Sequence, residues 1–251
     1  MRFHSRLTSL AACALTVAAL TGAPAEASAV SGQAAAVSAH GSAGFAKGVP
    51  AAALAARSAA WGAPCGPPFV QDDKLLGPVF LPHTFPLDKI LAGYRRYGGL
   101  IPADFLRRYL NPVTDFYRFP PDSGFAHAGG FSNARVLVTQ VKLPIGYRVD
   151  RFGGEGGAFL APYGTPFPAR ALPPSNLNNV PGDPHLCNYH VYRVIRPFYV
   201  DGGPAAPAFQ QPGQGEQFHT LARYIPGAPA NPDGEVSIGW LVDNGYLLPL
   251  N

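Results

Sequence analysis

Proline and glycine recur so often in this chain that long helices are disfavoured over most of its length. The sequence holds 28 prolines and 29 glycines among 251 residues. Proline lacks the N–H group that a helix interior needs, and glycine loses more backbone entropy on folding than any other residue. The pattern therefore predicts short strands joined by many fixed turns.

Segments with the two-residue period of strands dominate the second half of the chain. Two short helical patterns precede them, one after Pro86 and one after Pro102. Because strands and helices do not alternate, the predicted class is α+β, a small mainly antiparallel or mixed β-sheet domain with a short helical and irregular N-terminal lobe. The expected strands lie in the ranges 134–143, 146–152, 189–196, 217–219, 236–242 and 246–248.

The first residues have the pattern of an export signal. Arg2 and Arg6 precede an apolar run over 7–20, and small residues at 23–28 offer A-x-A cleavage sites. The run is too short for a permanent membrane span, and no later segment approaches about 18 apolar residues without charge. We expect a signal peptide and a secreted protein without a permanent membrane anchor, with an uncleaved anchor as the alternative.

Composition changes along the chain divide it into four predicted parts. They are a signal peptide at 1–27, a low-complexity leader or linker at 28–60, an irregular and helical N-terminal lobe at 61–130, and a β-rich catalytic domain at 131–251.

Charge is sparse, at 14% of residues against about 25% in typical globular domains. Removing Arg2, Arg6 and Glu26 with the signal leaves 17 basic and 14 acidic residues of the original 19 and 15. Nucleic-acid binding would require a dense basic stripe, and none is present in the sequence. We therefore expect no nucleic-acid partner.

Two cysteines, Cys65 and Cys187, remain once Cys13 has left with the signal. In an oxidising compartment such a pair predicts one disulfide, which would tie the N-terminal lobe to the main domain. A catalytic cysteine is the alternative, but no adjacent motif supports it.

The stretch 148–174 reads RVDRFGGEGGAFLAPYGTPFPARALPP. Arginines clamp phosphate, glycines let a backbone approach a ligand closely, and aromatic rings offer stacking faces. This mixture indicates a pocket for a flat, phosphate-bearing ligand; a Gly/Pro-rich connection between two strands is the other interpretation. Prolines 162 and 166 exclude the helix of a dinucleotide-binding fold, and the sequence contains no P-loop, G-x-S-x-G, C-x-x-C or H-x-x-x-H motif. We therefore predict no metal site.

Five sequence motifs in order resemble the TNT domain, a family of secreted NAD glycohydrolases named for the tuberculosis necrotizing toxin. They are YRRYGGLIP with FLRRYLNP, then VDRFGGEGGAFLAPYGTPFPARALPP, then YHVYRVIRPF, then PAF with QPGQGEQF, and finally GYL at 245–247. The resemblance covers about residues 90–250.

This resemblance implies roles for seven residues. Arg151 and Arg170 would hold the phosphates of NAD(P)+, and Gln217 would orient the ribose, the carboxamide or the attacking water. His190 is the third catalytic candidate. The remaining predicted substrate contacts are Phe152, Phe159 and Thr165, with the two phenylalanines flanking a base.

The resemblance also implies that NAD(P)+ is the substrate and that no further cofactor is needed. An immunity or inhibitor protein and a second copy of the chain are the partners it suggests. Some fungal members look calcium-binding, but the sequence has no Asp-rich calcium loop.

ADP-ribosyl transfer or cyclisation, and a non-catalytic binding module, are the alternative functions. Transfer is disfavoured because the E-x-E pair is replaced by Glu216-Gln217, whose side chains would alternate in a strand. Asp150 and Glu155 are expected to be solvated turn residues.

Overall fold

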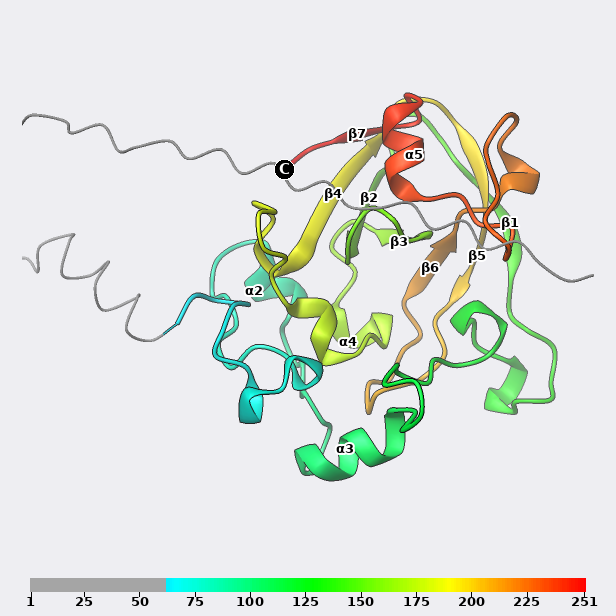
Figure 1. Ribbon diagram of the computed structural model, residues 1–251. Helices are drawn as coiled ribbons and strands as arrows, with labels where there is room; N and C mark the ends of the chain where they lie inside the picture. The colour runs from blue at the N-terminus through cyan, green and yellow to red at the C-terminus, as the bar shows by residue number, and fades with distance from the viewer. Residues whose placement is uncertain (1–61) are drawn as a thin grey trace, which may run out of the picture. The chain divides into compact units, whose positions relative to one another are not determined.

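A computed structural model describes residues 62–251 and contains a seven-stranded sheet (Figure 1). The strands pair in the order β1-β5-β6-β3-β2-β4-β7, and every pair is antiparallel. This arrangement confirms the predicted α+β class with an antiparallel sheet. The bounds are β1 Thr139–Leu143, β2 Arg148–Phe152, β3 Phe159–Pro162, β4 Tyr189–Val194, β5 Phe198–Pro204, β6 Glu216–His219 and β7 Leu247–Pro249.

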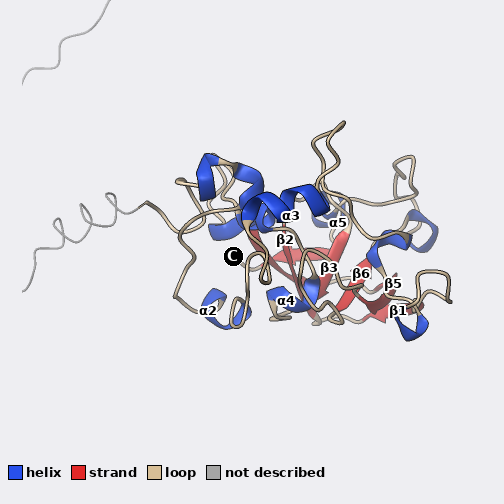
Figure 2. Ribbon diagram, turned by 90° about the horizontal axis from the view of Figure 1, so that it is seen from below, coloured by secondary structure: helices blue, strands red, loops and turns tan. Residues whose placement is uncertain are grey.

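Short helices surround the sheet, as Figure 2 shows from below. The α-helices are α2 Leu87–Ile90, α3 Pro102–Tyr109, α4 Phe167–Arg170 and α5 Ile238–Asp243. The first two confirm the helical patterns after Pro86 and Pro102. None of the helices over residues 62–251 is long and apolar enough to cross a membrane. One-turn 3₁₀ segments lie at Val70–Asp72, Lys74–Leu76, Asp122–Gly124, Ala128–Gly130, Pro174–Leu177, Leu186–Asn188 and Ala222–Tyr224.

One face of the sheet is covered by α5. Val149 of β2, Leu160 of β3 and Phe218 of β6 pack there in one apolar cluster with Ile238 and Leu241 of the helix, and each is at most 3% exposed. Because side chains alternate along a strand, the neighbouring residues Asp150, Phe159 and Gln217 fall on the opposite face.

The strand expected at 236–242 is wrong, because this segment forms α5. Ser237 caps the helix, accepting a hydrogen bond on its Oγ from the N–H of Trp240 at 3.2 Å. Ile238 and Leu241, three residues apart, are both fully buried. In so short a segment, this spacing and a strand period are hard to separate from sequence.

Three elements were not anticipated: β3, β5 and α4. β5 contains Gly202, Gly203 and Pro204, which in sequence indicate a turn. A side chain at Gly203 would collide with the Leu137 carbonyl oxygen, so this glycine permits a close approach of two backbones inside the sheet. The expected strand at 134–143 is correspondingly shorter and begins at Thr139.

Cys65 and Cys187 form a disulfide that joins the N-terminal segment to the turn before β4. Both cysteines are fully buried in a second apolar cluster, with Ile90, Phe152 and Phe167. Asn179 reinforces the junction: its Nδ2 donates to the Pro64 carbonyl at 3.0 Å, and its Oδ1 accepts from the Cys187 N–H at 2.7 Å.

The N-terminal lobe packs on the sheet domain through a third cluster. The rings of Tyr109 and Phe209 are 5.2 Å apart, and Phe105 is fully buried beside them. The boundary placed at 130/131 stays a prediction. The predicted signal peptide at 1–27 and leader at 28–60 lie outside the described residues.

Candidate active site

A cavity of about 520 Å³ is lined by residues of several elements, among them β2, β3, α4 and β6. Its volume lies within the range of about 300–1,000 Å³ typical of small-molecule sites. The lining brings together five of the predicted site residues from β2, β3, α4 and β6: Arg151, Phe152, Phe159, Arg170 and Gln217. We call this the arginine cavity.

Arg151 lies near the end of β2, and its guanidinium is held beneath the glycine-rich turn. Its Nε donates to the Gly153 carbonyl at 2.9 Å, and its Nη1 donates to the Phe159 carbonyl at 3.2 Å. A Cβ atom at Gly157 would overlap Nη2. Burial lowers the pKa of Arg151 from its ordinary value. The glycines of this turn therefore make room for the arginine side chain.

Arg170 ends α4 and forms a buried ion pair with Asp150. Its Nη2 lies 2.5 Å from Asp150 Oδ1, and the two side chains are 6% and 0% exposed. Asp150 Oδ2 also accepts from the Tyr189 hydroxyl at 2.6 Å and from the Gly164 N–H at 2.8 Å. The expectation that Asp150 is a solvated turn residue is wrong, because it lies in β2 and anchors Arg170.

Thr165 is not among the residues that line the arginine cavity. Its carbonyl accepts hydrogen bonds from Nε and Nη2 of Arg170 at 2.9 and 2.8 Å, and its hydroxyl donates to the Pro162 carbonyl at 2.7 Å. Thr165 therefore orients Arg170 through its backbone. Its predicted contact with substrate stays a prediction.

The two predicted aromatic contacts differ in how accessible they are. Phe152 is 3% exposed and packs edge-on against Phe167 and obliquely against Tyr189, with centroids 5.0 and 4.8 Å away. Phe159 is half-buried and stacks on His219, with the ring centroids 4.4 Å apart. Phe159 therefore has more ring surface left for a ligand.

Gln217 reaches the cavity from β6. Its Nε2 donates a hydrogen bond to the Ser123 carbonyl at 2.9 Å. This bond uses the amide nitrogen, so the amide oxygen remains available to a ligand. Glu216 also borders this cavity, although the two side chains alternate along β6. The Ser123 contact ties the catalytic candidate to a turn of the N-terminal lobe.

His219 and Glu235 are lining residues that the sequence reasoning missed. His219 Nε2 lies 2.8 Å from Glu235 Oε1, and the pair supports the Phe159 ring from behind. His219 follows Gln217 by two residues, so the strand period alone could have placed it on the same face. Glu235 gave no signal, because it comes from a loop distant in sequence. Other unanticipated lining residues are Phe119, Ser123 and Asn176.

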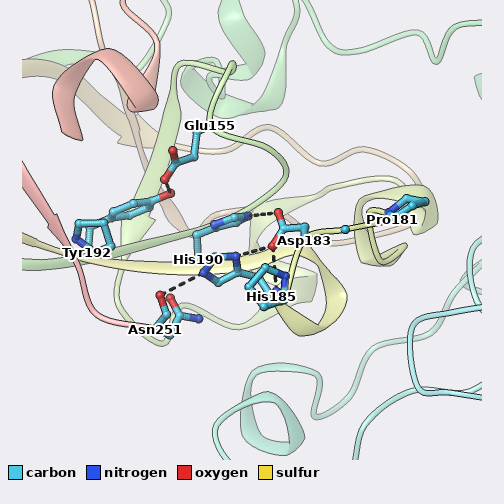
Figure 3. A pocket seen from close by; sticks show the side chains of 10 residues that line it. Glu155, Pro181, Asp183, His185, His190, Tyr192 and Asn251 are labelled. Carbon is cyan, nitrogen blue, oxygen red and sulfur yellow. Dashed lines mark hydrogen bonds and ion pairs between the residues drawn. The ribbon is translucent and has the colours of Figure 1, made fainter. Parts of the chain in front are cut away.

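His190 lines a second cavity of about 590 Å³, shown in Figure 3, whose lining does not include Gln217. It pairs with Arg151 in the register of β2 and β4, and its ring lines the second cavity together with Asp183, His185 and Tyr192. The ring is 3% exposed, and burial, followed by the neighbouring His185, lowers its pKa. The structure thus places His190 in a different cavity lining from Gln217, although His190 is the cross-strand partner of Arg151.

Glu155 also lines the second cavity and is half-buried. Its Oε1 accepts a hydrogen bond from the Tyr192 hydroxyl at 2.8 Å. Burial and this bond raise the pKa of Tyr192. Glu155 lies in a turn, as expected, but it is only partly solvated because it accepts this hydrogen bond.

Comparison with known proteins places this geometry in a family. The family model described as tuberculosis necrotizing toxin (TNT) matches residues 142–250. A relative from Aspergillus fumigatus, the conidial surface nicotinamide adenine dinucleotide glycohydrolase nadA, is 42% identical over 185 residues, covering 73% of this chain and 71% of the relative. The chain belongs to the TNT family. The resemblance stated from the sequence motifs is confirmed.

Two solved structures match this chain more distantly. The tuberculosis necrotizing toxin complexed with its immunity factor IFT is 20% identical, covers 64% of this chain and 80% of its own, and has a TM-score of 0.44. Rhs1-CT in complex with its cognate immunity protein RhsI1 is 17% identical, covers 45% of this chain and 77% of its own, and has a TM-score of 0.27. At these scores neither match supports an argument about the site.

Proposed function

We propose that this TNT-family chain is an NAD(P)+ glycohydrolase that cleaves the nicotinamide–ribose bond to give nicotinamide and ADP-ribose. The observation that carries the proposal is the convergence of two guanidinium groups, one carboxamide and one accessible aromatic ring in the arginine cavity. The name of the Aspergillus fumigatus relative supports the same chemistry.

The arginines supply donors for the pyrophosphate. Among residues 62–251, no hydrogen-bond partner engages Nη2 of Arg151 or Nη1 of Arg170, although their other nitrogens are bonded. Asp150 compensates the charge of Arg170, whereas no carboxylate of the described chain lies within ion-pair distance of Arg151. Arg151 therefore offers the stronger electrostatic attraction to a dianionic ligand.

The bond that breaks needs little acid catalysis. When the bond between C1′ and the nicotinamide nitrogen breaks, its electron pair neutralises the pyridinium, so the leaving group takes no proton. A water oxygen then adds to C1′ and releases its proton to solvent. The protein must position the ribose and stabilise an oxocarbenium-like centre. We assign this task to the amide oxygen of Gln217, because its Nε2 is already bonded to Ser123.

Three further properties follow as proposals from the export pattern and the family. The chain is secreted, and its role is that of a toxin or of an NAD scavenger outside the cell. An immunity protein and a second copy of the chain are its proposed macromolecular partners. ADP-ribosyl transfer or cyclisation, and a non-catalytic binding role, are the competing functions.

Nicotinamide release from NAD+ by the purified secreted chain tests the proposal. We expect turnover in the wild type and a loss of about 10²–10³ in kcat for Gln217→Ala, the size typical of removing one positioned polar group. Gln140→Ala is the matched control, because Gln140 is an exposed glutamine of β1 that lines neither cavity. Absence of nicotinamide release, or equal rates for both variants, would overturn it. Labelled acceptor protein or cyclic product would favour the competing reactions.

A further inference from the structure

We propose that Asp183, His185 and His190 form a binding site for a divalent transition-metal ion, of which zinc is the type. One ligand atom from each residue lies within 4.8 Å of the other two. All three line the second cavity, and Figure 3 shows the two imidazole rings and the carboxylate directed toward one another. We call these residues the histidine cluster. The proposal revises the prediction of no metal site and goes beyond the proposed NAD chemistry.

The hydrogen bonding of His185 indicates that a cation belongs in this cluster. Its Nε2 lies 3.0 Å from the carbonyl oxygen of Asn251, which can only accept, so Nε2 carries a proton. In the neutral ring, Nδ1 then presents a lone pair, and Asp183 Oδ1 lies 2.5 Å from it. Two acceptors at that separation repel each other unless a proton or a metal ion lies between them.

The second imidazole meets the same carboxylate from the other side. His190 Nε2 lies 3.7 Å from Asp183 Oδ2, and the rings of His185 and His190 have centroids 4.1 Å apart. His190 Nε2 also lies 3.0 Å from Asn188 Oδ1, a contact that metal binding would have to replace. When a tetrahedral metal ion lies about 2.0–2.2 Å from each ligand atom, any two ligand atoms are roughly 3.4 Å apart. His190 and Asp183 are already near this separation. Asp183, whose side chain is 22% exposed on a loop, needs to move by only about 1 Å from His185.

The surroundings match those of a transition-metal site in two respects. The Asn251 carbonyl fixes the tautomer and orientation of His185, as outer-shell acceptors commonly do for ligating histidines. The cavity beside the cluster leaves room for a fourth ligand, with Glu155 in its wall. Two imidazoles with one carboxylate favour zinc, copper or nickel over calcium, which prefers oxygen ligands alone.

A metal ion bound here would stabilise the position of β4, the strand that pairs with β2 of the arginine cavity. Asp183 and His185 lie on the loop that leads to Cys187, and His190 belongs to β4. His190 pairs directly with Arg151 in β2. A bound ion would thus link the loop to the strand that supports Arg151, and it would stabilise the folded state because the unfolded chain lacks the assembled ligands.

Equilibrium binding of Zn²⁺ to the untagged, chelator-treated secreted chain tests the proposal without using its activity. We expect one equivalent to bind, with a rise in Tm of several degrees, and we expect Co²⁺ to give the visible absorption of a tetrahedral N/O site. His185→Gln should weaken binding at least tenfold. It is preferred to a His190 variant, because His190 is almost fully buried and its replacement endangers folding.

Two control variants separate this site from adventitious histidine binding. His127→Gln removes another histidine that pairs with an aspartate, since His127 Nε2 lies 3.0 Å from Asp122 Oδ2, and no second histidine is paired with it. His83→Gln removes an exposed histidine. Both should bind Zn²⁺ like the wild type. Two outcomes would overturn the proposal in favour of a proton between His185 and Asp183. One is the absence of stoichiometric binding at about 100 μM Zn²⁺, a concentration at the weak end of specific metal sites. The other is unchanged binding in a folded His185→Gln variant.

Discussion

The two cavities take lining residues from the neighbouring strands β2 and β4 and differ in how their polar groups are satisfied. In the arginine cavity, Asp150 accepts from Arg170, Tyr189 and the Gly164 backbone, so its charge is matched by donors of the chain itself. In the histidine cluster, Asp183 Oδ1 lies 2.5 Å from Nδ1 of His185, whose Nε2 is bonded to the Asn251 backbone oxygen. The carboxylate of the first site is satisfied by donors of the chain, whereas that of the second needs a proton or the proposed metal ion between it and the ring.

The largest effect should come from removing the anchor of the arginine cavity. Asp150→Asn leaves the buried Arg170 without its counter-ion, and breaking a buried pair in this way costs about 3–5 kcal/mol. Urea unfolding measures the change. Asp201→Asn breaks the partly exposed pair with Arg223 and should cost less than about 1 kcal/mol. Equal losses in the two variants would show that the Asp150 pair is not the anchor described here.

Loss of the disulfide should be the next largest effect. Replacing Cys65 and Cys187 together by serine removes the disulfide cross-link between the N-terminal segment and the turn before β4. Loss of a native disulfide typically lowers the free energy of unfolding by about 2–5 kcal/mol. Because Cys187 is close to Asp183 and His185, metal affinity should fall further than the affinity for NAD+. Parallel measurement of Zn²⁺ binding and KM checks this, and a larger change in KM would contradict it.

A single methyl group should distinguish ligand positioning from stability. In Gly157→Ala the new Cβ displaces Nη2 of Arg151, a flexible end, so the fold should lose little stability. A misplaced catalytic group costs roughly ten- to hundredfold in rate, so kcat/KM for NAD+ should fall by about that factor. Gly154→Ala is the matched control in the same turn, because its Cβ meets no atom within 4 Å. Identical kinetics in both variants would remove Arg151 from the site.

The smallest effect should come from the wall of the second cavity. Tyr192→Phe deletes the hydrogen bond to Glu155 and should cost about 0.5–1.5 kcal/mol, with kcat/KM for NAD+ within twofold of the wild type. Thermal unfolding and nicotinamide release provide the two readouts. A large kinetic loss would show that the two cavities act as one site.

Much of the fold could be predicted from sequence wherever one rule acts alone. The helices after Pro86 and Pro102, and the strands around Val149 and Val191, follow from apolar periodicity and were placed within a few residues. The prediction failed at 236–242, where a serine cap outweighed a short β-branched run. It also failed at β5, where Gly202 makes room for the Val141 side chain and Gly203 for the Leu137 backbone. Both failures depend on what packs against the segment.

The site divides in the same way. The stretch from Arg148 to Pro174 indicated a phosphate-bearing ligand, because guanidinium, glycine and aromatic groups have a chemistry that is recognisable in the sequence, whereas Gln217 was assigned through the family resemblance. His190 was grouped with them, but only the pairing of β4 shows that it belongs to a different cavity. Asp183 and His185 gave no sequence signal, because their spacing to His190 matches no common metal motif.

The sequence by itself determined the class of fold, the pairing of Cys65 with Cys187 and the family, since each depends on residue types and their order. Only the tertiary structure decided that Asp150 is a buried anchor, that the glycines accommodate Arg151 and that three residues face one another beside β4. The physical reason is that burial, ion pairing and ligand geometry depend on distances between residues far apart in the chain. Those distances are set by strand register, which local sequence leaves open.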